Sequence, residues 1–586
     1  MSWRRTSGYL LLWLVSSSRG AWADESTSAA PAQSTFSSHP RVESPTEITV
    51  RGTSAAERTR RSAHAVEVVE LERAKRGSAD LGEVLARKSS LKVQREGGLG
   101  SLGRYSLNGL SGDRVRFFLD GVPLEFTPYQ LGVGNVPIGL VDRVEVYQGV
   151  VPVQFGADAL GGAVNLVTDE AVQANRFGGS YELASFQTHR LSLAGRVHSP
   201  KLRGFVRANA FADVTANDYA IDAEVFDDSG QVSTDRVRRF HDGYRAVGGT
   251  LGAGLVQQSW ADRVIAQVYA ADYARDVQHN TGMTVPYGEV TYGRRSLGGN
   301  VSYRKRFGRT WRFDAQLGYA ERSSRFRDLS NCRYDWYGRC FIRLPLAGEL
   351  DSVPLDRHVD ERGFFGRADV TFSPLPEHTL TLSLTPRILS RRGGDRQIPA
   401  DKYDALRAER SMQSGVLGLA YDLKSGRLAA SAFVKQYLQR AQSSERLPTA
   451  VTQQLRTNQP YLGAGDSLRV SLWPGVYAKG SFEQAVRLPT ADERFGDGGL
   501  IADNLRLEPE TSQNANLGAF VEDLEIPFGV VRGKLSGSAR RIDKLVVLLS
   551  TGSYYQYANV LRARALGTEA SLGWSSPGDR LGLDGN

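Results

Sequence analysis

The chain has 586 residues, too many for one ordinary globular core, so more than one domain is expected. Gly 62, Tyr 23 and Phe 23 beside only Met 3 and Cys 2 favour β structure over helix bundles. The net charge of +9 comes from basic residues spread along the chain, which argues against a nucleic-acid partner and is typical of solubility or of contact with anionic lipid.

The first 23 residues have the pattern of a secretory signal peptide. Arg4 and Arg5 precede an apolar run at Tyr9 to Val15, and Ala21-Trp22-Ala23 fits a small-residue cleavage site. The run is shorter than the about 20 apolar residues that a spanning helix needs, and a short anchor is the alternative. No later run is long and apolar enough for such a helix, so any membrane that the exported chain spans is expected to be crossed by strands.

Two segments of different composition follow. Residues 24–46 are rich in Ser, Thr, Ala and Pro, which predicts a disordered tether. A short strand-forming island, EITVRG at 47–52, comes next, and residues 53–170 have a mixed α+β pattern. Within that segment a helix is predicted in 78–90, where Leu81, Val84 and Leu85 recur at helical spacing.

Residues 171–586 show strand after strand with period two. In HTLTLSLTP, Leu380, Leu382 and Leu384 alternate with hydroxyl side chains, and the stretches beginning at Trp311, Phe364 and Val476 follow the same rule. A soluble β-sandwich alternates in this way too. Asymmetric loop lengths, some 400 residues without a second domain signal, and the secretion signal favour a transmembrane antiparallel β-barrel.

Two cysteines flank RYDWYGR. Cys332 and Cys340 are close enough in sequence to close a small loop, and the exported location predicts a disulfide. Two buried thiols are the alternative. A zinc site is not expected, because no second cysteine pair or histidine cluster accompanies them.

The glycine-rich stretches do not indicate an enzyme. Gly98, Gly100 and Gly103 spell G-x-G-x-x-G and Asp120 follows, but the next residues are broken by glycines where a phosphate-binding helix should begin. The chain has no P-loop, no H-E-x-x-H and no G-x-S-x-G, and its eight histidines form no catalytic or metal-binding group. We therefore expect no enzyme activity, cofactor or metal site.

Two stretches resemble the plug domain of TonB-dependent outer-membrane receptors. They are LGEVLARKSSLKVQREGGLGSLGRYSLNGLSGDRVRFFLDGVPL and VDRVEVYQGVVPVQFGADALGGAVNLVT. EITVRG is similar to that family's Ton box, and VRLPTADERFGDGGLIADNLRLEPE at 486–510 resembles a barrel segment ending in L-x-P-E. The resemblance implies a plug at 53–170 inside a 22-stranded type of barrel at 171–586.

The resemblance also assigns residues. Glu47, Ile48, Thr49 and Val50 would interact with a TonB-type energy-transducing protein of the inner membrane, by adding as an extended strand; the alternative is that they form the first plug strand. The plug motif residues are Asn108, Gly109, Asp120, Gly121, Gln148, Gly149, Gly156, Gly161 and Gly162. The glycines would permit tight turns and close backbone approach in the lumen.

The chain departs from the family pattern at two plug positions. Asn108 and Gln148 stand where the family carries arginines that meet barrel glutamates. We expect the latch between plug and barrel, with Glu493 as its barrel acid, to be neutral and weaker than a charged one. A large effect of Glu493→Gln on pore leakage would contradict this hypothesis.

The C-terminal end differs as well. Only about three strand-like stretches follow the L-x-P-E segment and the chain stops at RLGLDGN, so roughly six strands are expected to be missing and the barrel to stop before it closes. On this interpretation the chain is a truncated product or partial gene model.

The leading interpretation is a monomeric receptor in the outer-membrane lipid that takes up an iron siderophore, cobalamin or a similarly scarce small molecule. The alternatives are a non-functional truncated receptor fragment, a passive porin, and a surface-binding protein that uses loops 323–361 and 391–412. Tyr334, Trp336 and Tyr337 are candidates for stacking on a ligand, although a loop tip tied by a disulfide explains them too. Haem is disfavoured, because 487–510 contains no histidine.

Overall fold

The computed structural model describes residues 55–585 apart from positions 73, 77–80, 89, 96, 102, 131, 157, 169–173, 227–230, 281, 351, 447–451, 551–554 and 580. The predicted signal peptide, tether and Ton box, with Glu47, Ile48, Thr49 and Val50, lie outside the described residues. Thr53–Asn586 form one compact unit.

The N-terminal part of this unit is a small α+β plug. A five-stranded sheet has the order β1-β7-β8-β5-β6, and β2-β3-β4 form a second sheet. The helix predicted in 78–90 is present as α2. The plug elements are α1 (Ala55–Arg60), β1 (Val66–Glu70), η1 (Ala74–Arg76), α2 (Leu81–Lys88), β2 (Lys92–Arg95), β3 (Gly103–Leu107), β4 (Leu110–Ser111), η2 (Gly112–Arg114), β5 (Val115–Leu119), β6 (Val122–Pro123), η3 (Leu124–Phe126), η4 (Val133–Asn135), η5 (Ile138–Leu140), β7 (Val141–Gln148), η6 (Val153–Phe155) and β8 (Gly162–Thr168).

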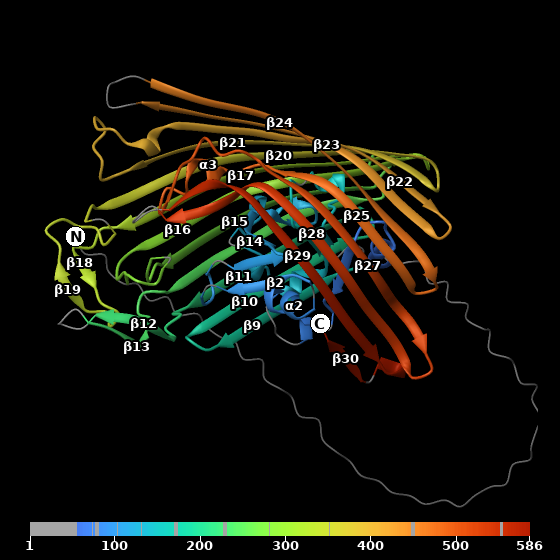
Figure 1. Cartoon of the computed structure of the whole chain (residues 1–586), viewed down its shortest axis with the longest axis horizontal. Coiled ribbons are helices and arrows are strands. Elements are labelled where there is room, and N and C mark those ends of the chain that lie inside the picture. Colours follow the sequence, from blue (N-terminus) through green and yellow to red (C-terminus); the bar gives the residue numbers. More distant parts are fainter. Residues whose placement is uncertain are drawn as a thin grey trace, which may run out of the picture. The chain divides into compact units, whose positions relative to one another are not determined.

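The rest of the unit is a large antiparallel barrel. Its strands lie side by side from β9 (teal) to β29 (red), with the plug elements α2 and β2 among them (Figure 1). The barrel strands are β9 (Arg176–Ala184), β10 (Thr188–Ser199), β11 (Gly204–Thr215), β14 (Tyr244–Val256), β15 (Arg263–Asp276), β16 (Thr291–Phe307), β17 (Trp311–Asp328), β20 (Leu355–Leu375), β21 (His378–Asp395), β22 (Glu409–Ser425), β23 (Leu428–Arg446), β24 (Thr452–Trp473), β25 (Val476–Arg487), β27 (Glu510–Ile526), β28 (Gly529–Ser550), β29 (Tyr555–Ser575) and β30 (Gly582–Gly585).

The period-two pattern of the barrel strands is confirmed. On β21, Leu380, Leu382 and Leu384 are 41–48% exposed on the outside, whereas Thr381 and Ser383 are 1% exposed inside. An apolar outer face and a polar lumen are what a transmembrane strand requires, because lipid contacts one face and the plug or water the other. Among the described helices, none is long and apolar enough to cross a membrane.

The two ends of the barrel differ. At one end the strands are joined by turns such as 308–310, 376–377 and 474–475, and at the other by long connections. These connections carry β12 (Ala220–Phe226), β13 (Val232–Arg238), β18 (Cys332–Tyr334), β19 (Cys340–Arg343), η7 (Ala405–Arg407), α3 (Ala491–Phe495) and β26 (Ile501–Ala502), while η8 (Pro577–Asp579) lies in a turn. Long loops of such barrels face the outside and short turns the periplasm, so we name the ends the loop side and the turn side.

The barrel closes, and the expectation that its strands stop before closure is wrong. The sheet order forms a ring in which β30 is the neighbour of β9, although β30 pairs with β29 only at Leu572–Ser575. The ring has fewer strands than the about 22 of the type that the resemblance implies. Closure pairs backbone groups that an open edge would expose to lipid, but at β29 it does so only for the four residues that pair with β30.

Two loops are shorter in the structure than the sequence predicted. The stretch 323–361 was expected to be a loop, but β17 continues to Asp328 and β20 begins at Leu355. In the same way β21 and β22 enter the predicted loop 391–412. The strand ends are polar because they leave the apolar zone, while backbone pairing continues across them.

Candidate functional site

The candidate site is the interface between the plug and the barrel wall, because the plug motif residues lie there. Asn108 (φ 53°) and Gly109 (φ 78°) form a turn in the left-handed region, and the Asn108 amide donates to the Gly161 carbonyl at 3.3 Å. Asp120 (φ 52°) and Gly121 (φ 77°) form another such turn. These conformations favour Gly and Asn or Asp.

The Asp120 turn is fixed to both the plug and the wall. Its carboxylate accepts bonds from the Thr168 backbone N–H at 2.8 Å and from the Thr168 hydroxyl at 2.6 Å. Its carbonyl accepts a bond from Gln316 of β17 at 3.0 Å, and the Gly121 carbonyl accepts one from Arg367 of β20 at 3.4 Å. The turn therefore joins the edge of the plug sheet to the barrel.

Two motif glycines lie where the plug backbone meets barrel side chains. Gly156 has φ 52°, and a Cβ there would overlap Thr385 of β21. Gly149 has φ 93°, and a Cβ there would overlap Asn516 of β27. A larger residue at either position would push the plug away from the wall.

Gln148 bonds to a barrel lysine rather than to a barrel acid. Its side-chain oxygen accepts a bond from Lys534 Nζ of β28 at 2.9 Å, and its nitrogen donates to Glu67 at 3.3 Å and to Ser90 Oγ. Burial raises the pKa of Glu67, against the opposing effects of Lys534 and the bonds from Ser90. The neutral amide therefore sits between a lysine and a carboxylate.

The charged contact between plug and barrel uses Arg114 and Glu510. Arg114 donates to Glu510 at 2.7 Å, and Glu510 also accepts from Arg487 at 2.5 Å. Arg487 donates to Glu493 at 2.8 Å. We name these four residues the ion network; Glu510 and Arg487 are 0% and 1% exposed.

The prediction that Glu493 is the barrel acid facing Asn108 or Gln148 is wrong in its pairing. Glu493 is the third residue of α3 and forms a capping box with Thr490, so its carboxylate accepts the Thr490 N–H at 2.7 Å as well as Arg487. Burial alone would raise the pKa of Glu493, but Arg487 and these bonds lower it overall. Glu493 positions Arg487, and Glu510 receives the plug.

A second charged pair lies within the plug. Arg116 donates to both oxygens of Asp158, at 3.2 and 2.9 Å, and Asp158 also accepts the Leu488 N–H at 3.1 Å. Burial opposes ionisation of Asp158, yet Arg116 and Arg387 lower its pKa overall. The ionised carboxylate thus joins the plug to the segment after β25.

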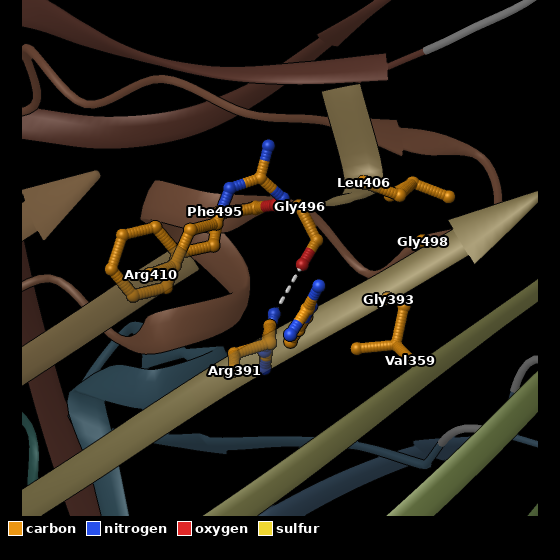
Figure 2. Close-up of a pocket in the computed structure, with 9 residues that line it drawn as sticks. Val359, Arg391, Gly393, Leu406, Arg410, Phe495, Gly496 and Gly498 are labelled. Atoms are coloured by element: carbon orange, nitrogen blue, oxygen red, sulfur yellow. Dashed lines mark hydrogen bonds between the residues drawn. The ribbon is translucent and has the colours of Figure 1, made fainter. Parts of the chain in front are cut away.

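That segment, 488–509, is held against the wall on the loop side. Figure 2 shows Arg391 bonded to the Gly496 carbonyl, at 2.5 Å, with Arg410 near Phe495. Arg410 donates to the Phe495 carbonyl at 3.2 Å, and Arg391 also bonds to Glu361. The small space that these residues surround has no room for a water molecule, so it is a packed junction rather than a ligand site.

The predicted stacking residues of the loop have different environments. Cys332 and Cys340 form a disulfide. Trp336 is 3% exposed and packs against Val225 and Val237 of the β12–β13 hairpin, so the expectation that it stacks on a ligand is wrong. Tyr337 is 52% exposed, and Tyr334 donates to Glu289 at 2.7 Å. Trp336 belongs to a small hydrophobic core between two loops, and only the tertiary structure brings these loops together.

Sequence reasoning missed Arg114, Lys534 and Arg391. Arg487 and Glu510 lie in the 486–510 segment that carried the resemblance, so their positions could have been found there. Nothing local marks Arg114 or Lys534, because their partners are more than 380 residues away. Among the residues that the structure describes, no group of three His, Cys, Asp or Glu could hold a metal ion.

Comparison with known proteins agrees with this architecture. Residues 58–163 match the family model described as the TonB-dependent Receptor Plug Domain. The chain is 30% identical over 120 residues to the vitamin B12 transporter BtuB of Vibrio cholerae, which covers 20% of this chain and 19% of that protein, and 30% identical over 86 residues to BtuB of Vibrio vulnificus, covering 15% and 14%. The matches therefore span less than a fifth of these relatives' length.

Solved structures share the whole fold. The FrpB iron transporter of Neisseria meningitidis superposes with a TM-score of 0.64 at 13% identity, covering 88% of this chain and 78% of that one. The copper transporter OprC gives 0.62 at 15% identity, covering 87% and 78%. Fold and site thus define a plugged β-barrel of the bacterial outer membrane. Residues 58–163 match the model of a TonB-dependent receptor plug, and the chain shares a plug-and-barrel fold with these solved transporters.

Proposed function

We propose that this protein takes up a scarce small molecule across the outer membrane, driven by a TonB-type protein that pulls on the Ton box at 47–52. The observation that carries the proposal is the way in which the plug is bound in the lumen. Arg114, Lys435 and Lys479 make individually breakable bonds between plug and wall. A plug bound in this way can be displaced without unfolding the barrel.

The lysine contacts illustrate this. Lys435 of β23 donates to the Val151 carbonyl of the plug at 3.0 Å, and Lys479 of β25 donates to the carbonyls of Arg60 and His64 at 3.0 and 2.7 Å. Both lysines bond to backbone oxygens of the plug, so a shift of the plug breaks these bonds, while Lys435 keeps its ion pair with Glu483 of β25 at 3.2 Å. Force applied upstream of Arg60 would reach the Lys479 contact first.

The ligand class is a metal chelate or a cobalamin-like cofactor. Proteins with this architecture include those described as vitamin B12, copper and iron transporters and siderophore receptors. A passive porin is disfavoured, since the plug lies in the lumen. A surface-binding role is the second candidate, supported by the ordered loop core around Trp336.

The test is uptake by cells of labelled cobalamin, copper and ferric siderophores. Val50→Pro is expected to abolish energised uptake of the true ligand, because proline cannot donate the backbone bond of an added strand. Ser34→Pro in the predicted tether is the matched control and should leave uptake unchanged. Equal uptake by both variants, or uptake that continues without TonB, would refute the proposal.

A further inference from the structure

A cavity of about 480 Å³ separates one face of the plug from the barrel wall. On the plug it is lined by the end of α2, the start of β2, the Asn108–Gly109 turn and Gln148; on the wall it is lined by β25, β27, β28 and β29. Its volume lies within the range of small-molecule sites. The two amides that replace the family's arginines therefore face a space, which we name the chamber.

The chamber lining combines uncharged polar groups with apolar surface. Ser90, Asn108, Gln148, Asn516, Ser536 and Ser538 contribute hydroxyl and amide groups. Three charged side chains belong to the lining: Glu569 accepts from Lys534 at 2.7 Å, Lys479 donates to two plug carbonyls, and Lys92 is exposed to solvent. The hydroxyl and amide groups of the lining offer both donors and acceptors, which suits the hydroxyl groups of a ligand.

An aromatic face completes the lining. Phe520 of β27 lines the chamber and stacks on Tyr477, with ring centroids 5.2 Å apart and planes 8° apart. Hydroxyl and amide groups beside an aromatic face complement a ring-shaped molecule that is polar at its edge and apolar on its flat side.

The chamber is closed on the loop side by an apolar layer. Leu110 and Leu160 of the plug pack against Ala485 of β25 and Ile542 of β28, and all four are at most 6% exposed. Ala485 and Ile542 lie four residues nearer the loops than Ser481 and Ser538 of the chamber, about 13 Å along each strand. We name these four residues the apolar seal.

Barrel side chains hold the seal in place. Arg540 and Asn514 donate to the Leu160 carbonyl at 3.0 and 3.4 Å. On the turn side the lining reaches solvent: Lys92 of the chamber is exposed, and the neighbouring α2 side chain of Arg87 is 72% exposed. The chamber is thus open towards the turns and shut towards the loops.

We propose that the chamber is a binding site on the periplasmic side of the plug for an uncharged, hydroxyl-rich small molecule, or for such a part of the transported ligand, and that the Leu160 seal separates it from the loop side. The proposed site depends on the proposed uptake function only for the direction in which the solute moves. A solute that passes the displaced seal finds hydroxyl and amide partners before it reaches the periplasm.

The first experiment measures access with single cysteines in porin-deficient cells that lack TonB, using a small charged thiol reagent. Ser538→Cys is expected to react after osmotic shock opens the periplasm and to stay unmodified in intact cells. Asp401→Cys, in a loop with a 77% exposed side chain, should react in both, and Leu535→Cys, which faces lipid, in neither. Because these cells lack TonB, the labelling result does not depend on energised uptake. A failed prediction here is therefore distinguishable from a failure of the proposed uptake function.

A variant that weakens the apolar seal gives the decisive comparison. Arg540→Ala in the Ser538→Cys background removes a bond to the Leu160 carbonyl and should allow modification in intact cells. Arg207→Ala is the matched control, since it removes a lumen arginine of β11 that bonds to Gln267 of β15 and to Thr168 of the plug, and not to the Leu160 carbonyl. Modification of Ser538→Cys from outside with Arg540 present, or none from either side, would overturn the proposal.

The second experiment tests the ligand class with sucrose as the probe, on the purified Ser538→Cys protein in lipid nanodiscs. Sucrose is expected to slow modification about twofold once its concentration equals the Kd, because half of the sites are then filled. Glycine betaine, a solute without hydroxyl groups, should not slow it, and neither should affect Asp401→Cys. Equal rates with sucrose and betaine would overturn the assignment.

Discussion

The plug meets the wall in two different ways on its two sides. Towards the loops, Arg114 enters a buried ion network in which each carboxylate accepts at least two bonds. Towards the turns, the neutral amide of Gln148 accepts a bond from the Lys534 ammonium beside an open chamber. The contrast indicates that the loop side is held by ion pairs, whereas on the turn side lysines bond to neutral oxygens of the plug, so a pull from the periplasm meets those lysine bonds first.

The largest effect is expected at Glu510. Glu510→Gln leaves Arg114 and Arg487 without their shared carboxylate, and breaking a buried pair costs about 3–5 kcal/mol. We expect the free energy of plug unfolding in urea to fall by that amount and single-channel conductance to rise. An unchanged conductance would mean that the ion network does not close the loop side.

The turn side is expected to respond to pH through His64. Burial lowers the pKa of His64 to about 3, with Lys479, Lys435 and Lys424 adding to the effect. The unfolded plug, with a pKa near 6.5, binds this proton first, so the stability that the neutral ring allows is present above pH 6.5 and is lost as pH falls towards 3.

The variant His64→Gln isolates this contribution. Its plug stability, measured in urea at several pH values, should fall less than that of the parent between pH 6.5 and 3. Parallel pH profiles of parent and variant would show that His64 is not held neutral in the folded plug.

A smaller effect separates wall contact from backbone strain. Gly156→Ala adds a Cβ that overlaps Thr385, which costs about 1–3 kcal/mol beyond the strain of a positive φ. Gly112→Ala, at φ 69° with nothing within 4 Å of its Cβ, carries only the strain. Plug unfolding in urea should rank the two variants in that order, and equal losses would show that Gly156 does not press on the wall.

The smallest effect is expected at Glu493. Glu493→Gln keeps an oxygen that can accept from Thr490 and Arg487, Arg487 keeps its ion pair with Glu510, and no hydrogen bond from the described plug residues ends on Glu493, so stability should fall less than with Glu510→Gln. Conductance should match that of the parent. A leak as large as that of Glu510→Gln would show that the whole ion network, and not Glu510 alone, secures the plug.

Much of the fold could be predicted from local pattern. Strand alternation follows from the need for opposite solvents on the two faces, and Leu380 to Thr385 of β21 show it residue by residue. The turns at Asn108 and Asp120 were also foreseeable, since a short polar residue before glycine favours the left-handed region. The site was harder to predict from the sequence. Arg114 pairs with Glu510, and Gln148 with Lys534, across more than 380 residues of the chain.

The sequence by itself determined which residues can form lipid-facing strands, a plug and a disulfide, because these depend on side-chain period, composition and short spacing. Only the tertiary structure decided that Glu510 rather than Glu493 receives the plug, that Trp336 is buried, that the barrel closes, and that Gln148 borders a chamber. Those outcomes depend on which strands lie opposite one another in the ring, and no local pattern of residues encodes that register.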